Sequence, residues 1–410
     1  MFNLRHRLPI CLSGALCAVA LAVCAAAAET NQAPAVWQGV VVGKALQLSI
    51  LKPDTKDADA PLPLIIYLKN LAAPRLGTES DESILQDFHK AGYLVVTLDY
   101  AHDPKARVPF INRDLGKLRN DLRAKKILRQ FRIDPAHIYI VPEGDRLRRD
   151  VPYYHDGDRT LALDIIYPSR PAKPVGAVIE FSCDNENRYG NTSLSICSDT
   201  MLDAEATEGF AVCMADHPVA APYKGLDPMP DCACKIKAAV RTLRAAGKEL
   251  GLNGKIVPFG FSRGSGMALM LVTTEGMKQF EGRGEHTNVS STVQGAVVLS
   301  GRFTYLDLLP DDEMLPRYAK AWGGRTNHLD VWRSEGALDY LQHATMPLFL
   351  SINCTESPDA LHQMEVLRKR LAELHSPATF MLDPEPRGHK VPLVPDILGA
   401  INGYLKQRLN

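Results

Sequence analysis

The segment from Lys255 to Ala268 constrains the fold of this chain most strongly, because it combines an apolar run, a tight turn and the start of a helix. Within it, Gly260, Ser262 and Gly264 form the pattern G-x-S-x-G. Glycines at these two positions permit a strained turn from a strand into a helix, and such a turn carries the serine hydroxyl out over the carboxyl end of a sheet. The segment therefore predicts a strand, a sharp turn with Ser262 at its apex, and a helix.

This arrangement makes Ser262 a candidate nucleophile. The N-terminus of the following helix directs N–H groups toward any oxyanion that forms beside the hydroxyl. The small residues Ser265, Gly266 and Ala268 let the helix pack close to the strand. In a simpler alternative, Ser262 only caps the helix and carries no chemistry.

The composition is that of a globular chain without a strong charge bias. The 410 residues include 47 Lys plus Arg and 47 Asp plus Glu, and 46% of the residues are hydrophobic. A balanced net charge gives no indication of nucleic acid or of an anionic membrane surface as a partner. The length allows two domains, or one large domain with an extension.

The N-terminus has the pattern of a signal peptide. Two arginines precede an apolar run from Leu8 to Ala28, which ends in an Ala-x-Ala cleavage site. Residues 1–28 are therefore expected to be removed, and the mature chain is expected to be periplasmic or secreted in a bacterium. Two alternatives stay open: a retained membrane anchor, and a lipoprotein attached through Cys24. No later segment is apolar enough to span a membrane.

Six of the nine cysteines remain after removal of the signal peptide. An even number in an exported chain is compatible with disulfides, although the pairing cannot be deduced from sequence. The pair Cys232 and Cys234 lacks a second close Cys or His pair, so no zinc site is expected. The six are Cys183, Cys197, Cys213, Cys232, Cys234 and Cys354.

Strands and helices alternate along the mature chain in two similar rounds, which predicts an α/β fold. We divide the chain into the signal peptide 1–28, an N-terminal α/β region 29–149 without catalytic residues, and a catalytic domain 150–410. The stretch Ile138–Gly144 matches Ile256–Ser262 and has no serine at the turn, so the first round is interpreted as a degenerate duplication. The alternative is that two βαβ stretches resemble each other by their common rhythm. Residues 303–345 are expected to form a helical lid.

A serine hydroxyl needs a base to take its proton, and the base needs an acid to orient it. His389 follows Gly388 after the last strand, which lets its imidazole reach across the top of the sheet, and we take it as the base. The acid is expected in the turn after the preceding strand, where Glu356 and Asp359 both occur. Glu356 is favoured because it lies nearer the strand end, whereas Asp359 has an alternative role as a cap of the next helix.

The oxyanion of an acyl-transfer intermediate needs two hydrogen-bond donors. One is expected to be the main-chain N–H of Arg263, directly after the nucleophile. The second is expected in the loop that follows the strand Val175 to Phe181, at Cys183 or Asp184.

Together these motifs resemble those of the α/β-hydrolase superfamily over residues 150–410. Among its members the chain is most similar to secreted bacterial esterases of the dienelactone-hydrolase or acetyl-xylan-esterase kind. The resemblance implies a mostly parallel sheet with helices on both faces and a Ser-His-acid triad that needs no metal or other cofactor. It also implies hydrolysis of small acyl esters of carbohydrate or aromatic alcohols.

Two other functions remain alternatives. A peptidase of the prolyl-oligopeptidase type uses the same triad, but its usual partner is a β-propeller, and residues 29–149 instead alternate helices with strands. A non-catalytic binding protein with a retired hydrolase fold is the other alternative, and the intact Ser262, Gly264 and His389 argue against it.

Overall fold

The computed structural model describes residues 36–42, 46–51, 60–70, 75–99, 132–181, 188, 209–216, 218, 229–391 and 394–410. These residues form two compact units, one within residues 1–72 and 81–143 and the other within 73–80 and 144–410. The boundary that we predicted between residues 149 and 150 falls inside a strand of the second unit. Residues 73–80 belong to the second unit, and the Glu79 carboxylate in this segment forms an ion pair of 2.7 Å with Arg146 of that strand.

In the first unit, the described strands form a five-stranded sheet in the order β1-β2-β4-β3-β5. The pairs β1·β2 and β2·β4 are antiparallel, whereas β3 runs parallel to both β4 and β5. This single sheet is not divided into propeller blades. Its elements are β1 (Val36–Val42), β2 (Leu46–Leu51), β3 (Leu62–Lys69), α2 (Asp81–Lys90), β4 (Leu94–Asp99) and β5 (Ile133–Pro142).

The second unit is built on an eight-stranded sheet in the order β13-β12-β11-β10-β8-β9-β7-β6. All neighbouring strands are parallel except β7, which is antiparallel to β9 and β6. The strands are β6 (Asp145–Asp156), β7 (Arg159–Pro168), β8 (Val175–Phe181), β9 (Ala211–Ala215), β10 (Leu252–Phe261), β11 (Ala296–Leu299), β12 (Leu348–Asn353) and β13 (Ala378–Asp383). The helical elements are α6 (Met229–Leu250), α7 (Arg263–Thr273), η2 (Lys278–Phe280), α8 (Leu315–Trp322), α9 (Leu329–Glu335), η3 (Ala337–Tyr340), α10 (Pro358–Glu373) and α11 (Pro395–Leu409).

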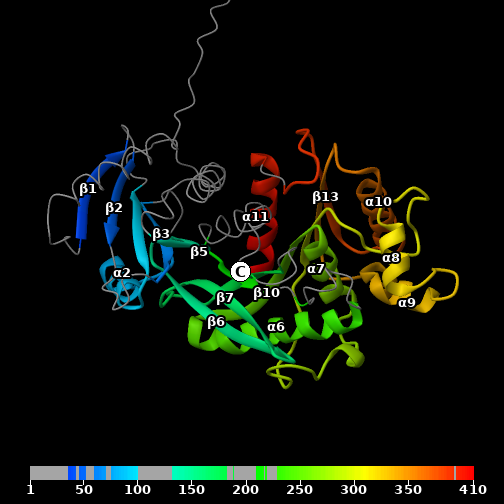
Figure 1. The fold of residues 1–410 in the computed structure, drawn as a ribbon, viewed down its shortest axis with the longest axis horizontal. Coiled ribbons are helices and arrows are strands. Elements are labelled where there is room, and N and C mark those ends of the chain that lie inside the picture. The colour runs from blue at the N-terminus through cyan, green and yellow to red at the C-terminus, as the bar shows by residue number, and fades with distance from the viewer. Residues whose placement is uncertain are drawn as a thin grey trace, which may run out of the picture. The chain divides into compact units, whose positions relative to one another are not determined.

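Helices cover both faces of this sheet, because its central strands are apolar on both sides. Leu348 and Leu350 of β12 belong to the core cluster that includes α6, α7 and α10. The intervening Phe349 points to the other face, where its ring lies 5.9 Å from that of Tyr404 in α11. In Figure 1, α11 and α6 accordingly lie on opposite sides of β10. The predicted fold class, a mostly parallel sheet between helices, is confirmed.

The sheet of the first unit repeats five strands of the second in order and direction. The order β1-β2-β4-β3-β5 corresponds to β6-β7-β9-β8-β10, with antiparallel and parallel pairs in the same places. The strand registers agree as well. Ile138 of β5 pairs with Leu64 of β3, and the corresponding residue of the second unit, Ile256 of β10, pairs with Ala177 of β8. Gly144 then stands at the position of Ser262. This agreement supports the interpretation of the first round as a duplication that has no nucleophile.

The predicted helical lid contains α8, α9 and η3. Its aromatic side chains pack mainly on one another: the rings of Tyr318 and Trp322 stack at 4.9 Å, and Trp332 meets Trp322 edge-on at 5.5 Å. Trp332 is 1% exposed. These rings give the insertion a small core of its own.

Several sequence predictions fall outside the described residues, namely the signal peptide and the cysteines Cys183 and Cys197. Among the described residues, Cys213, Cys234 and Cys354 are free thiols. None of the helices within the described ranges combines the length and the apolarity needed to cross a membrane.

Candidate active site

Ser262 lies at the junction between β10 and α7, in a backbone conformation that few residues adopt. Its φ is 56° and its ψ is −120°, and its N–H donates to Leu299 O at 3.1 Å. The turn closes only because its flanking residues lack side chains: a Cβ on Gly260 would lie 2.2 Å from Gly264 O, and one on Gly264 would lie 2.6 Å from Phe181 O. The two glycines therefore permit the strained turn that the G-x-S-x-G pattern predicted.

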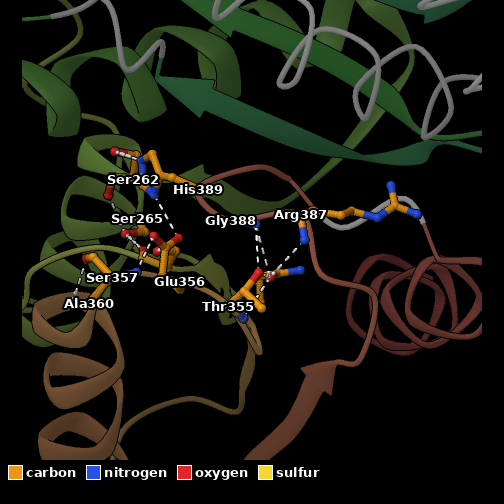
Figure 2. Close-up of polar contacts among 11 residues, drawn as sticks. Ser262, Ser265, Thr355, Glu356, Ser357, Ala360, Arg387, Gly388 and His389 are labelled. Carbon is orange, nitrogen blue, oxygen red and sulfur yellow. Dashed lines mark hydrogen bonds and ion pairs between the residues drawn. The ribbon is translucent and has the colours of Figure 1, made fainter.

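The Ser262 hydroxyl does not cap the helix that follows it. Although Ser262 occupies the N-cap position of α7, its side chain makes no capping hydrogen bond. Its Oγ instead lies 2.9 Å from Nε2 of His389, as Figure 2 shows. The capping alternative is therefore wrong for the side chain, which is free to face the imidazole.

His389 is held in place by the loop that follows β13. Gly388 has a φ of 64°, and its N–H donates to Thr355 Oγ1 at 3.0 Å (Figure 2). The same N–H donates to Asn353 Oδ1 at 3.2 Å. The imidazole packs beside the Phe261 ring, with 4.7 Å between the ring centroids. The His389 side chain is 47% exposed, so one side of the ring is open to a substrate.

Glu356 completes a continuous hydrogen-bonded chain. Its Oε2 accepts from Nδ1 of His389 at 2.7 Å and from Ser300 Oγ at 2.9 Å, and its Oε1 accepts from the main-chain N–H of Ser357 at 2.9 Å. Burial alone would raise the pKa of Glu356, but these hydrogen bonds outweigh burial and hold that pKa below its ordinary value. An ionised carboxylate can only accept, so Nδ1 carries a proton and Nε2 faces the serine hydroxyl as an acceptor.

The structure separates the two acidic residues that the sequence left as candidates. Asp359 does not contact the imidazole; its carboxylate lies 3.6 Å from Nη2 of Arg302. Nor is it the cap of α10, because the side chain of Ser357 occupies that place and accepts from Ala360 N at 3.3 Å. Of the two carboxylates, Glu356 is the one joined to His389.

Of the expected oxyanion donors, only Arg263 can be placed. It is the first residue of α7, directly after Ser262, so its main-chain N–H stands at the N-terminal end of that helix. Cys183 and Asp184 lie outside the described residues.

A cavity of about 400 Å³ opens beside Ser262 and His389. The predicted lid contributes Tyr305, Met314, Arg317 and Tyr318 to its wall. Within the described ranges, no three His, Cys, Asp or Glu side chains gather in a group that could hold a metal ion.

Two residues of the site were not singled out from the sequence. Asn353, the last residue of β12, is 3% exposed and joins the acid turn to the histidine loop through hydrogen bonds to Thr355, Arg387 and Gly388. Ser300 directly follows β11 and contacts the acid. The available signal was their position, because each is a polar residue at the carboxyl end of an apolar parallel strand. Ser300 follows β11, the neighbour of the strand that leads to Ser262, and Asn353 ends β12, the next strand in the sheet.

The fold is shared with solved esterase structures at low sequence identity. A truncated carbohydrate esterase from gut microbiota aligns with a TM-score of 0.53 and 17% identity over 64% of this chain and 95% of its own. Propionate-bound Est2 of Thermogutta terrifontis aligns with a TM-score of 0.50 and 16% identity over 65% of this chain and 94% of its own. A bifunctional GH43-CE protein of Bacteroides eggerthii aligns with a TM-score of 0.53 and 18% identity over 64% of this chain and 38% of its own.

The comparison with curated proteins gives no match. The profile of the BD-FAE family matches residues 163–370, which is just over half of the chain. The matched range contains the Ser262 turn, the turn that carries Glu356, and the strands between them. The chain therefore belongs to the BD-FAE family, whose domain is an esterase domain of the α/β-hydrolase type.

Proposed function

We propose that this chain is a serine carboxylic ester hydrolase that works through an acyl-enzyme. The observation that carries the proposal is the hydrogen-bonded chain from Ser262 Oγ through His389 to Glu356, with distances of 2.9 and 2.7 Å. This chain joins a nucleophile, a base and an acid in the roles that acyl transfer needs. Est2 and the carbohydrate esterases that share the fold support the same class of reaction.

In the proposed mechanism, Ser262 Oγ attacks the ester carbonyl while Nε2 of His389 takes its proton. The bond to the alcohol then breaks, and His389 returns the proton to the leaving oxygen, which leaves the acyl group on Ser262. Water attacks this acyl-enzyme with His389 again as base, and the carboxylic acid is released. Glu356 keeps the imidazole in the required tautomer and stabilises the imidazolium.

The oxyanion that forms twice in this cycle needs fixed donors. The main-chain N–H of Arg263 is the first donor in our proposal, because it follows the nucleophile at the start of α7. The second is Cys183 or Asp184 in the loop after β8. Loss of one such donor typically costs about 3–4 kcal/mol of transition-state stabilisation.

For the substrate we propose small acyl esters of carbohydrate or aromatic alcohols. The cavity of about 400 Å³ lies at the lower end of the size range of small-molecule sites. Tyr305 and Met314 give the cavity apolar wall, and Arg302 and Arg317 add hydrogen-bond donors. The structures named as carbohydrate esterases support the carbohydrate option.

The first test is hydrolysis of p-nitrophenyl acetate and butyrate by the protein and its variants. We expect Ser262→Ala and His389→Ala to lower kcat/KM by at least about 10³-fold, because either change removes the activated nucleophile. His362→Ala is the matched control: His362 pairs with Asp307 at 2.9 Å but does not line the cavity, and it should keep wild-type turnover. Turnover that survives in Ser262→Ala would contradict the proposal.

The identity of the acid is tested by comparing Glu356→Gln with Asp359→Asn. Glu356→Gln should lower kcat by about 10³- to 10⁴-fold, because the amide no longer fixes the imidazole tautomer. Asp359→Asn should change kcat by less than about threefold, since its carboxylate faces Arg302 and not His389. Equal losses in both variants, measured on folded protein by steady-state kinetics, would refute the assignment.

We also propose that the chain is exported and cleaved after Ala28. The basic and apolar N-terminus supports this proposal. Intact-mass analysis of protein recovered from a bacterial periplasm or medium should give a mature chain that begins at Glu29. A chain that retains Met1 in the cytoplasm would contradict export, and a lipid-modified Cys24 would replace this proposal with a lipoprotein.

A further inference from the structure

Ser300 lies between the nucleophile and the acid in the order of the sheet. It directly follows β11, which runs between β10 and β12, while Ser262 ends the turn after β10 and Glu356 follows β12. Ser300 is 2% exposed and has a φ of 57°. A buried serine held in the left-handed region costs the fold free energy, and such residues concentrate at functional sites.

The Ser300 hydroxyl points at the atom through which the acid acts. Its Oγ donates to Glu356 Oε2 at 2.9 Å, and the same oxygen accepts from Nδ1 of His389 at 2.7 Å. The other oxygen, Oε1, accepts from Ser357 N. Both oxygens of the Glu356 carboxylate are therefore fixed, which removes the freedom to rotate about its terminal bond.

The main chain of Ser300 is tied to the elbow from the other side. The Ser265 hydroxyl lies within hydrogen-bonding distance of both Ser262 O and Ser300 O. Gly301 permits this close approach, since a Cβ there would lie 2.1 Å from Ser265 Oγ and 2.6 Å from Ser262 O. Ser300 is thus the residue through which the nucleophile elbow and the acid are held relative to each other.

We infer that Ser300 is a positioning residue that fixes the Glu356 carboxylate for His389 and links it to the Ser262 elbow. The inference deepens the proposed function and rests on it. A glutamate side chain has one more rotatable bond than an aspartate, so an acid of this length gains most from a second donor. The hydrogen bond from Ser300 is also among the interactions that lower the pKa of Glu356 against the effect of burial.

The test compares Ser300→Ala with a matched variant, Ser351→Ala. Ser351 is a fully buried serine on β12, and its Oγ has no hydrogen-bond partner in the described part of the chain. Ser300→Ala should lower kcat about tenfold with KM changed by less than about twofold, because a less well-oriented imidazole affects the transition state and not substrate binding. Ser351→Ala should keep the wild-type kcat.

Two further variants separate positioning from a merely structural role. Ser300→Gly removes the hydroxyl, so it should lower kcat as much as Ser300→Ala does. Because glycine adopts the left-handed conformation without strain, the denaturant midpoint of unfolding should equal or exceed that of the wild type. In a Glu356→Gln background, removal of the Ser300 hydroxyl should cost less than about twofold, because its effect passes through the carboxylate. A kcat loss that tracks the unfolding midpoint, or that is equally large in the Glu356→Gln background, would overturn the inference.

A measurement without substrate keeps this test independent of the proposed reaction. The low-field proton resonance of His389 Nδ1 reports its hydrogen bond to Glu356 Oε2, which Ser300 shares. It should shift in Ser300→Ala and stay in place in Ser351→Ala. An unshifted resonance in folded Ser300→Ala refutes the role of Ser300, whereas a shifted resonance in a protein without Ser262-dependent turnover would refute the proposed reaction alone.

Discussion

The close packing at the Ser262 turn is the constraint on which the rest of the site depends. Gly260 meets the main chain of Gly264, and Gly264 meets Phe181 O, at distances that no side chain would allow. The turn therefore brings the start of α7 against the end of β8. This contact holds Ser262 in its unusual conformation, and it fixes the direction in which the hydroxyl and the Arg263 N–H leave the sheet.

The order of the parallel strands then places the residues of the site next to one another. β10, β11 and β12 are neighbours, so the residues after them, Ser262, Ser300 and Glu356, meet at one edge of the sheet. Asn353 joins the Glu356 turn to the loop that carries His389, and this loop brings His389 to Ser262 from 127 residues further along the chain. The five described strands of the first unit repeat the arrangement of the first five strands of the second, and Gly144, directly after the first unit, corresponds in sequence to Ser262.

The sequence alone was sufficient to predict the strands, the turn at Ser262 and the loop at His389, because each depends on a local sequence pattern. Ser262 and His389 were predicted from glycines that a strained turn and a loop require, and the strands from their apolar runs. The choice between Glu356 and Asp359 depended on which carboxylate faces the imidazole, and three residues of spacing cannot decide that. Ser300 and Asn353 were missed because their roles come from strand adjacency, which brings groups 34 to 56 residues apart into contact. Cys183 and Asp184 remain predictions.

The account rests on the claim that Ser262 is a nucleophile activated by His389. The most direct measurement is labelling of the folded protein with a fluorophosphonate, followed by mass spectrometry of its peptides. The account predicts a single stoichiometric adduct on Ser262, and little or none in His389→Ala. A folded wild-type protein that stays unlabelled, or that carries the adduct on another residue, would contradict it.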